Sequence, residues 1–149
     1  MKKHSIYTNL SFILTALLLC AVLTLSVTAP MITDMYIRDN CPQYLSSYPV
    51  ILTSIYVVLA VALIAIIVLF RLLFVVKENR VFSDSTFQIM SALSMCCFAE
   101  VVAFSLLGMY FLLSFVLSFS SLFLGVLLLV VRYVIMQATE IKEENDFTV

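Results

Sequence analysis

Glu100 is the residue of this chain whose type and setting are best suited to chemistry. It is the only charged residue between Asp84 and Arg132, and apolar or small uncharged residues surround it on both sides. An ionisable group inside an apolar segment of membrane-spanning length is a hypothesis for a functional site. Because an unpaired carboxylate in a low-dielectric environment takes up a proton, we expect Glu100 to be neutral at rest.

Small residues recur near Glu100 at three- and four-residue spacing, which lets two membrane helices approach closely. One stripe lies beside Glu100 and a second lies in the next apolar segment, namely Ala92, Cys96, Ala99 and Ala103, then Ser114, Ser118, Ser121 and Gly125. An antiparallel turn near residues 112–113 would place Glu100 at the height of Gly125, with Ser121 one helical turn away. We therefore predict an intramembrane polar site of Glu100, Ser121, Cys96, Cys97 and Gly125, with Glu100 hydrogen-bonded across the hairpin.

Two interpretations of Glu100 compete. In the structural one, the protonated carboxyl group ties two helices together through a bond worth about 1 kcal/mol. In the functional one, Glu100 binds a proton or a cationic ligand and couples that binding to a conformational change. A transporter usually has several polar intramembrane groups or broken helices. The sequence offers one acid and no proline inside a predicted helix, which favours the structural interpretation.

Cysteine chemistry is a third alternative, and the sequence argues against it. Cys96 and Cys97 are adjacent, so they do not form a CxxC redox motif, and the single histidine is His4. A cysteine nucleophile without a neighbouring base is poorly activated, and no Cys/His cluster suggests a zinc site. Cys41, the only cysteine expected outside the membrane, either stays free or pairs between two copies. We expect no enzyme activity, no cofactor and no metal.

The composition requires a membrane around these residues. The chain has 149 residues, of which 64% are hydrophobic and 11% charged, whereas soluble domains are about 45–50% apolar and about 25% charged. A spanning helix needs about 20 apolar residues. The uncharged stretches predict a single all-α membrane domain, a four-helix bundle with helices at residues 10–29, 50–76, 87–111 and 114–136.

The first apolar segment is interpreted as an anchor that is retained. Lys2 and Lys3 followed by Val27-Thr28-Ala29 resemble a cleavable signal peptide, but the apolar stretch far exceeds the usual ~7–15 residues. Pro30 would also follow the cleavage point, which is unfavourable.

The distribution of Lys and Arg predicts that both termini are cytoplasmic. With that orientation Arg38 is the only basic residue outside, and the inner side holds the other seven, Lys2, Lys3, Arg71, Lys77, Arg80, Arg132 and Lys142. Arg71 and Arg132 lie near helix ends, where their side chains can extend to the inner headgroups.

Three segments lie outside the predicted helices. The outer loop, residues 30–49, carries Tyr36, Tyr44 and Tyr48, which suit an interfacial position; a ligand or partner surface is the alternative. In the inner loop, residues 77–86, Ser83, Asp84 or Ser85 can cap the third helix. The cytoplasmic tail, residues 137–149, is expected to extend the fourth helix by one or two turns. Its acids form a candidate docking strip for a basic partner, namely Glu140, Glu143, Glu144 and Asp146.

The second half of the chain resembles a known family. The inner-loop segment Glu-Asn-Arg-Val-Phe-Ser at residues 78–83, the apolar hairpin and the last ten residues, Glu-Ile-Lys-Glu-Glu-Asn-Asp-Phe-Thr-Val, look like the YoaS-like small bacterial membrane proteins. That family is a domain of unknown function with four predicted helices. Its members are often encoded beside a small helix-turn-helix regulator of the Xre type, which implies such a partner. The family more often has polar or basic residues where this chain has Asp-Ser-Thr-Phe at residues 84–87, and it supplies no catalytic residues.

Together these features predict a multi-pass protein of a bacterial cytoplasmic membrane, with a non-enzymatic regulatory or accessory function. The inner loop and acidic tail would contact a cytoplasmic partner, since a basic surface complements an acidic one. The alternative is a small proton- or cation-coupled transporter, compatible with a homo-oligomer, in which Glu100 is the coupling carboxylate. Direct nucleic-acid binding is not expected, because the tail would repel phosphate.

Overall fold

Four long helices make up the protein. The computed structural model describes the backbone of residues 2–78 and 83–147, and the side chains of residues 8–78 and 83–141. The elements are α1 (Lys2–Asn40), the 3₁₀ helix η1 (Pro42–Ser47), α2 (Tyr48–Lys77), α3 (Asp84–Gly108) and α4 (Leu112–Phe147). In this part of the chain all four α-helices are long and apolar enough to cross a membrane. The predicted all-α class with four spans is therefore confirmed.

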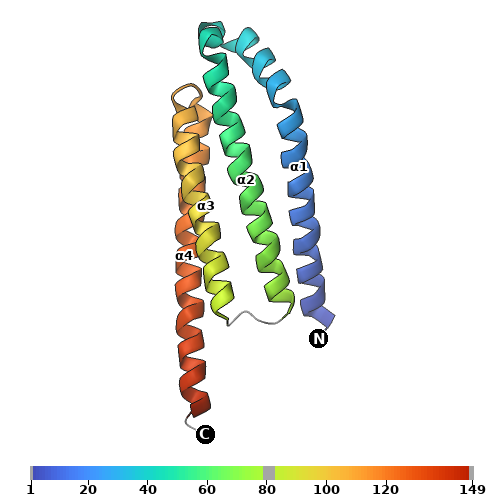
Figure 1. Ribbon diagram of the computed structural model, residues 1–149, viewed down its shortest axis with the longest axis vertical. Helices are drawn as coiled ribbons and strands as arrows, with labels where there is room; N and C mark the ends of the chain where they lie inside the picture. The colour runs from blue at the N-terminus through green and yellow to red at the C-terminus, as the bar shows by residue number, and fades with distance from the viewer. Residues whose placement is uncertain (1, 79–82, 148–149) are drawn as a thin grey trace.

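The helices run alternately up and down, and each packs against its neighbour along the chain (Figure 1). No other pair of α-helices brings Cα atoms within 8 Å of each other over the described residues. The arrangement is thus a row of helices and not a bundle closed by packing of α1 on α4. The first helix begins and the last helix ends at the same end of the molecule (Figure 1).

The end where α1 and α2 are joined, here called the outer end, contains a cluster of buried hydrophobic residues. Ile37 is 1% exposed and Ile51 is fully buried, and both contact Leu107 from α3. Aromatic rings surround this cluster, with edge-to-face pairs between Tyr44 and Tyr110 and between Tyr36 and Phe111, each at 5.5 Å between centroids. The tyrosines expected at headgroup depth therefore also connect α1 and η1 to the turn between α3 and α4.

The predicted outer loop at residues 30–49 is wrong over much of its length, because α1 continues through Pro30 to Asn40. Proline lacks an N–H group, so the Ser26 carbonyl one turn earlier loses its intrahelical partner. The Tyr56 hydroxyl of α2 lies 3.3 Å from that carbonyl oxygen and donates to it, and the Tyr48 hydroxyl donates to the Pro30 carbonyl, also at 3.3 Å. Membrane helices tolerate proline where a neighbouring helix satisfies the freed group.

Other boundaries differ from the predicted ones by smaller amounts. The third helix begins at Asp84, a turn earlier than predicted, with Ser83 before it in an extended conformation. The Ser83 hydroxyl lies 3.2 Å from that of Thr86, and the predicted cap bond to a backbone N–H of the first turn is not formed. Residues 79–82 of the predicted inner loop lie outside the described residues. The fourth helix continues to Phe147, further than the one or two extra turns expected.

The inner ends of α1 and α2 are held by aromatic packing. The Phe12 ring of α1 lies against Phe70 and Phe74 of α2, at 6.3 and 5.2 Å between centroids. The Lys77 ammonium group lies 5.8 Å above the Phe12 ring, a cation–π contact at the end of α2. These contacts place a positive charge at the last turn of α2, where the helix dipole favours it.

The bond between Tyr56 and Ser26 yields a prediction about how α1 continues through Pro30. Tyr56→Phe should lower the free energy of unfolding by about 1 kcal/mol, because the Ser26 carbonyl is left without a donor in lipid. In a Pro30→Ala background the same change should cost less, since a backbone N–H at position 30 then bonds that carbonyl. A double-mutant cycle in mixed micelles measures this coupling. Tyr133→Phe on α4 is the control, and an equal cost of Tyr56→Phe in both backgrounds would contradict the assignment.

Candidate functional site

The candidate site lies between α3 and α4, and a tight turn determines how these helices meet. The backbone N–H groups of Tyr110 and Phe111 both donate to the Leu107 carbonyl at 3.0 Å, which ends α3. A Cβ atom on Gly108 would lie 2.9 Å from the Phe115 ring, so a larger residue would displace that ring from the α3 backbone. The turn thus occupies residues 109–111 and precedes the predicted turn at residues 112–113.

Glu100 and Ser121 meet across this interface, as the sequence predicts. The Ser121 hydroxyl donates to Glu100 Oε2 at 3.2 Å, with Ser121 buried and Glu100 half-buried. Within the described residues the one salt bridge joins Asp34 to Arg38, at the outer end, so Glu100 has no basic partner there. A single hydroxyl donor suits a bond that ties two helices together. That Glu100 also acts as a functional site stays a prediction.

Gly125 does not lie opposite Glu100, contrary to the predicted register. A Cβ atom on Gly125 would lie 3.3 Å from the Cys97 Cβ atom and 3.2 Å from the Phe98 ring, so Gly125 faces these two residues. The Ser94 hydroxyl, 1% exposed, donates to the Gly125 carbonyl at 3.0 Å. The earlier position of the turn explains the difference, because it shifts every pairing between the two antiparallel helices.

A second group of hydroxyls lies between Glu100 and the turn. The Ser118 hydroxyl of α4 donates to the Val101 carbonyl of α3 at 3.0 Å, and the Ser105 hydroxyl donates to the same carbonyl at 2.7 Å. The two hydroxyl oxygens are 2.9 Å apart. The α3–α4 interface therefore has hydrogen bonds at three heights, with Ser94, Glu100 and Ser105 on α3 as their members.

The stripe of small residues predicted on α4 is buried, but the one predicted on α3 is not at the interface. Ser114, Ser118, Ser121 and Gly125 are all buried. On α3 only Ala103 of the predicted set is buried, whereas Ala92 and Ala99 are exposed. The face that α3 turns to α4 instead carries Ser94, Val101 and Ser105. Ser94, Val101 and Ser105 recur at helical spacing, so the sequence does contain a signal for this face of α3.

The two cysteines of the predicted site, Cys96 and Cys97, lie beside Glu100, one turn earlier on α3. Cys96 and Cys97 are half-buried free thiols, and the side chain of His4 lies outside the described ones. Among the described residues no three His, Cys, Asp or Glu side chains lie close enough to hold a metal ion. Arg132, a further ionisable residue of the spans, has a buried Nε atom without a hydrogen-bond partner in this part of the chain.

Comparison with known proteins gives one match. A family model described as "Protein of unknown function (DUF2975)" matches residues 3–149, which is nearly the whole chain. No curated protein and no solved structure matches.

The bond between Glu100 and Ser121 can be tested by removing either partner. Glu100→Leu removes the acceptor and should lower the free energy of unfolding by about 1 kcal/mol. Glu100→Gln keeps an acceptor oxygen for Ser121 and a neutral side chain, so it should cost less. A double-mutant cycle with Ser121→Ala, followed by reversible unfolding in mixed micelles, isolates the pair. Ser120→Ala is the control, because that exposed hydroxyl bonds the Val116 carbonyl of its own helix. Equal losses for Glu100→Gln and Glu100→Leu would contradict a neutral hydrogen-bonding role.

Proposed function

We propose that this chain, which belongs to the DUF2975 family of proteins of unknown function, is a non-enzymatic regulatory or accessory membrane protein. In this proposal the C-terminal extension of α4 is the segment that binds a cytoplasmic protein. The four apolar helices hold that extension at the membrane surface.

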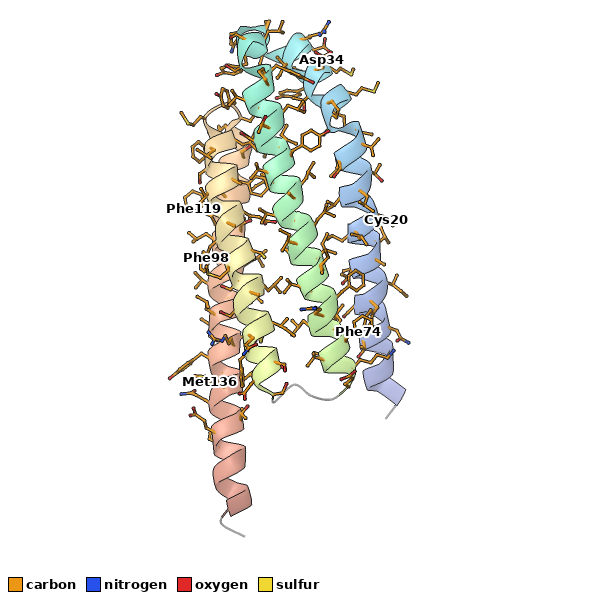
Figure 2. The ribbon with its side chains drawn as sticks, in the orientation of Figure 1. Cys20, Asp34, Phe74, Phe98, Phe119 and Met136 are labelled. Carbon is orange, nitrogen blue, oxygen red and sulfur yellow. The ribbon has the colours of Figure 1, made fainter. Side chains whose placement is uncertain are left out.

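The observation that carries the proposal is the length of α4. This helix continues without interruption to Phe147, whereas the long apolar stretch of its sequence ends at Met136. In Figure 1 it projects well beyond the adjacent ends of α1, α2 and α3, and in Figure 2 it continues past Met136 with no other helix beside it. A helix that extends past its neighbours in this way presents its residues to the space beside the membrane.

Charge supports a basic partner for this extension. Residues three and four apart share a helix face, so Glu140, Glu143 and Glu144 fall on one face of the extension. Lys142 is the only basic residue of the tail. The side chains of Glu143, Glu144 and Asp146 lie outside the described ones, whereas the helical backbone is described to Phe147. The resemblance to YoaS-like proteins suggests an Xre-type regulator as the partner.

The proposed location is a bacterial cytoplasmic membrane, with both chain ends inside. α1 begins and α4 ends at the same end of the row of helices (Figure 1), so the basic residues near both ends lie on one side. Arg71 and Lys77 of α2 lie toward that end as well. The excess of Lys and Arg at one end favours placing it in the cytoplasm.

The proposed absence of enzyme activity rests on Glu100 and the two thiols beside it. Glu100 accepts one hydrogen bond from Ser121, and within the described residues no hydrogen bond joins Cys96 or Cys97 to a side chain that could act as a base. Pro30 lies inside α1, contrary to the expectation that no span contains a proline. The Ser26 carbonyl that Pro30 frees is nevertheless bonded by Tyr56, so α1 is not broken into two half-helices.

Removal of the tail tests the proposal. A chain ending at Thr139 should lose a soluble protein that co-purifies with the full chain from its native membrane in mild detergent. Replacing Glu140, Glu143 and Glu144 with Gln keeps good helix formers and should weaken the association, most strongly at low salt. Asp34→Asn removes an acid from the opposite end and serves as the control.

The captured protein must then bind a synthetic peptide of residues 137–149 directly, with an affinity that falls as salt increases. The tail is not a docking segment if the shortened and full-length chains retain the same soluble proteins. The same conclusion follows if the captured protein does not bind the peptide.

A further inference from the structure

A cavity of about 400 Å³ lies in the outer half of the protein, and all four helices contribute to its walls. It is lined by Ala29 and Thr33 of α1, Val58 of α2, Phe104 of α3, and Ser114 and Leu117 of α4, among mostly apolar neighbours. Ligand pockets in proteins are typically about 300–1,000 Å³, apolar, with a few polar groups that orient the ligand. In size and lining this cavity fits that description.

The cavity is open and not enclosed, and the packing of the helices explains why. Residues of α1 and α4 form two of its walls, but these helices do not bring their Cα atoms within 8 Å over the described residues. The gap between them is therefore not sealed by helix packing. In a membrane, such an opening faces the lipid chains.

Two hydroxyl groups that line the cavity have no hydrogen-bond partner among the residues that the structure describes. Thr33 is 7% exposed and Ser114 is 8% exposed, and neither hydroxyl makes a hydrogen bond within the described part of the chain. Other hydroxyls of the spans bond the carbonyl four residues earlier, as Thr15 does to Ser11 and Thr28 does to Thr24. Their hydroxyl oxygens are not among the fully buried atoms, and a hydroxyl that faces lipid without a partner costs free energy, so an occupant that brings an acceptor would be favoured.

The depth of these hydroxyls indicates which acceptor is available. Thr33 directly precedes Asp34, whose exposed ion pair with Arg38 begins the charged end of α1. Figure 2 places Asp34 at the outer end of the molecule. Tyr36, which also lines the cavity, suits the interface. Hydroxyls slightly nearer the centre of the bilayer than Asp34, the first charged residue at the outer end of α1, lie where the ester groups of outer-leaflet lipids are found.

We propose that this cavity binds one acyl chain of a phospholipid, with Thr33 and Ser114 donating hydrogen bonds to its ester carbonyl oxygen. A helix of a second copy is a poorer occupant, because its backbone carbonyls are already bonded within the helix. Its lipid-facing leucine and valine side chains would offer no acceptor to either hydroxyl.

Lipid retention in defined bilayers tests the inference. The full chain is reconstituted in nanodiscs of dioleoyl phosphatidylcholine or of its diether analogue, which has the same chain length but no ester carbonyl. After extraction, native mass spectrometry counts the lipid molecules that remain bound. The wild-type chain should retain the ester lipid about threefold or more in excess over the ether lipid.

Four matched variants separate the hydroxyls from general effects of substitution. Thr33→Val and Ser114→Ala should each reduce retention of the ester lipid and remove the preference over the ether lipid. Thr28→Val and Ser120→Ala, in which exposed hydroxyls bonded to their own helix are lost, should leave it unchanged. Ala29→Phe fills the cavity and should reduce retention of both lipids.

Three results would overturn the inference. Equal retention of ester and ether lipids by the wild-type chain would exclude a role for the carbonyl group. Unchanged retention in Thr33→Val and Ser114→Ala would exclude the two hydroxyls. A lipid-free dimer that Ala29→Phe converts to a monomer would show that a second copy occupies the cavity.

Discussion

The structure depends on one constraint, that polar backbone groups within a bilayer must find partners inside the protein. Pro30 shows it most clearly, because it frees the Ser26 carbonyl and Tyr56 from the neighbouring helix bonds it. The same constraint explains why most hydroxyls in the spans bond either a carbonyl of their own helix or one of the next. Ser94 and Ser118 are of the second kind, and their bonds to Gly125 and Val101 join α3 to α4.

Side-chain size then determines which helices pack closely. Gly108 and Gly125 allow aromatic rings and the Cys97 side chain to lie against helix backbones, and buried serines fill the rest of the α3–α4 interface. The first two helices instead meet through bulky aromatic side chains such as Phe12 and Phe74. The α3–α4 hairpin packs closely through small residues, whereas α1 and α2 are separated by larger side chains. A gap remains between α1 and α4, which are not in contact over the described residues. The open cavity is a consequence of this difference.

Much of this architecture could be predicted from hydropathy alone, because uncharged stretches of spanning length determine the number and type of the helices. The pairing of Glu100 with Ser121 could also be predicted, since both residues lie on faces fixed by helical spacing. The continuation of α1 past Pro30 could not, because its support comes from Tyr56, far along the chain. The predicted register of α3 against α4 is wrong, because the hairpin turns at residues 109–111, beside the close contact of Gly108 with Phe115.

The most direct test of this account is the register of α3 against α4, since that register joins Glu100 to Ser121 and places Ser114 at the cavity. A Cβ atom on Gly125 would lie 3.3 Å from the Cys97 Cβ atom, close to the about 3.5–4.5 Å that disulfides span. With Cys20, Cys41 and Cys96 replaced by Ser, Gly125→Cys should form an intramolecular disulfide with Cys97 on oxidation, detectable by peptide mass spectrometry. Cross-linking of Gly125→Cys to Glu100→Cys in preference to Cys97 would contradict it.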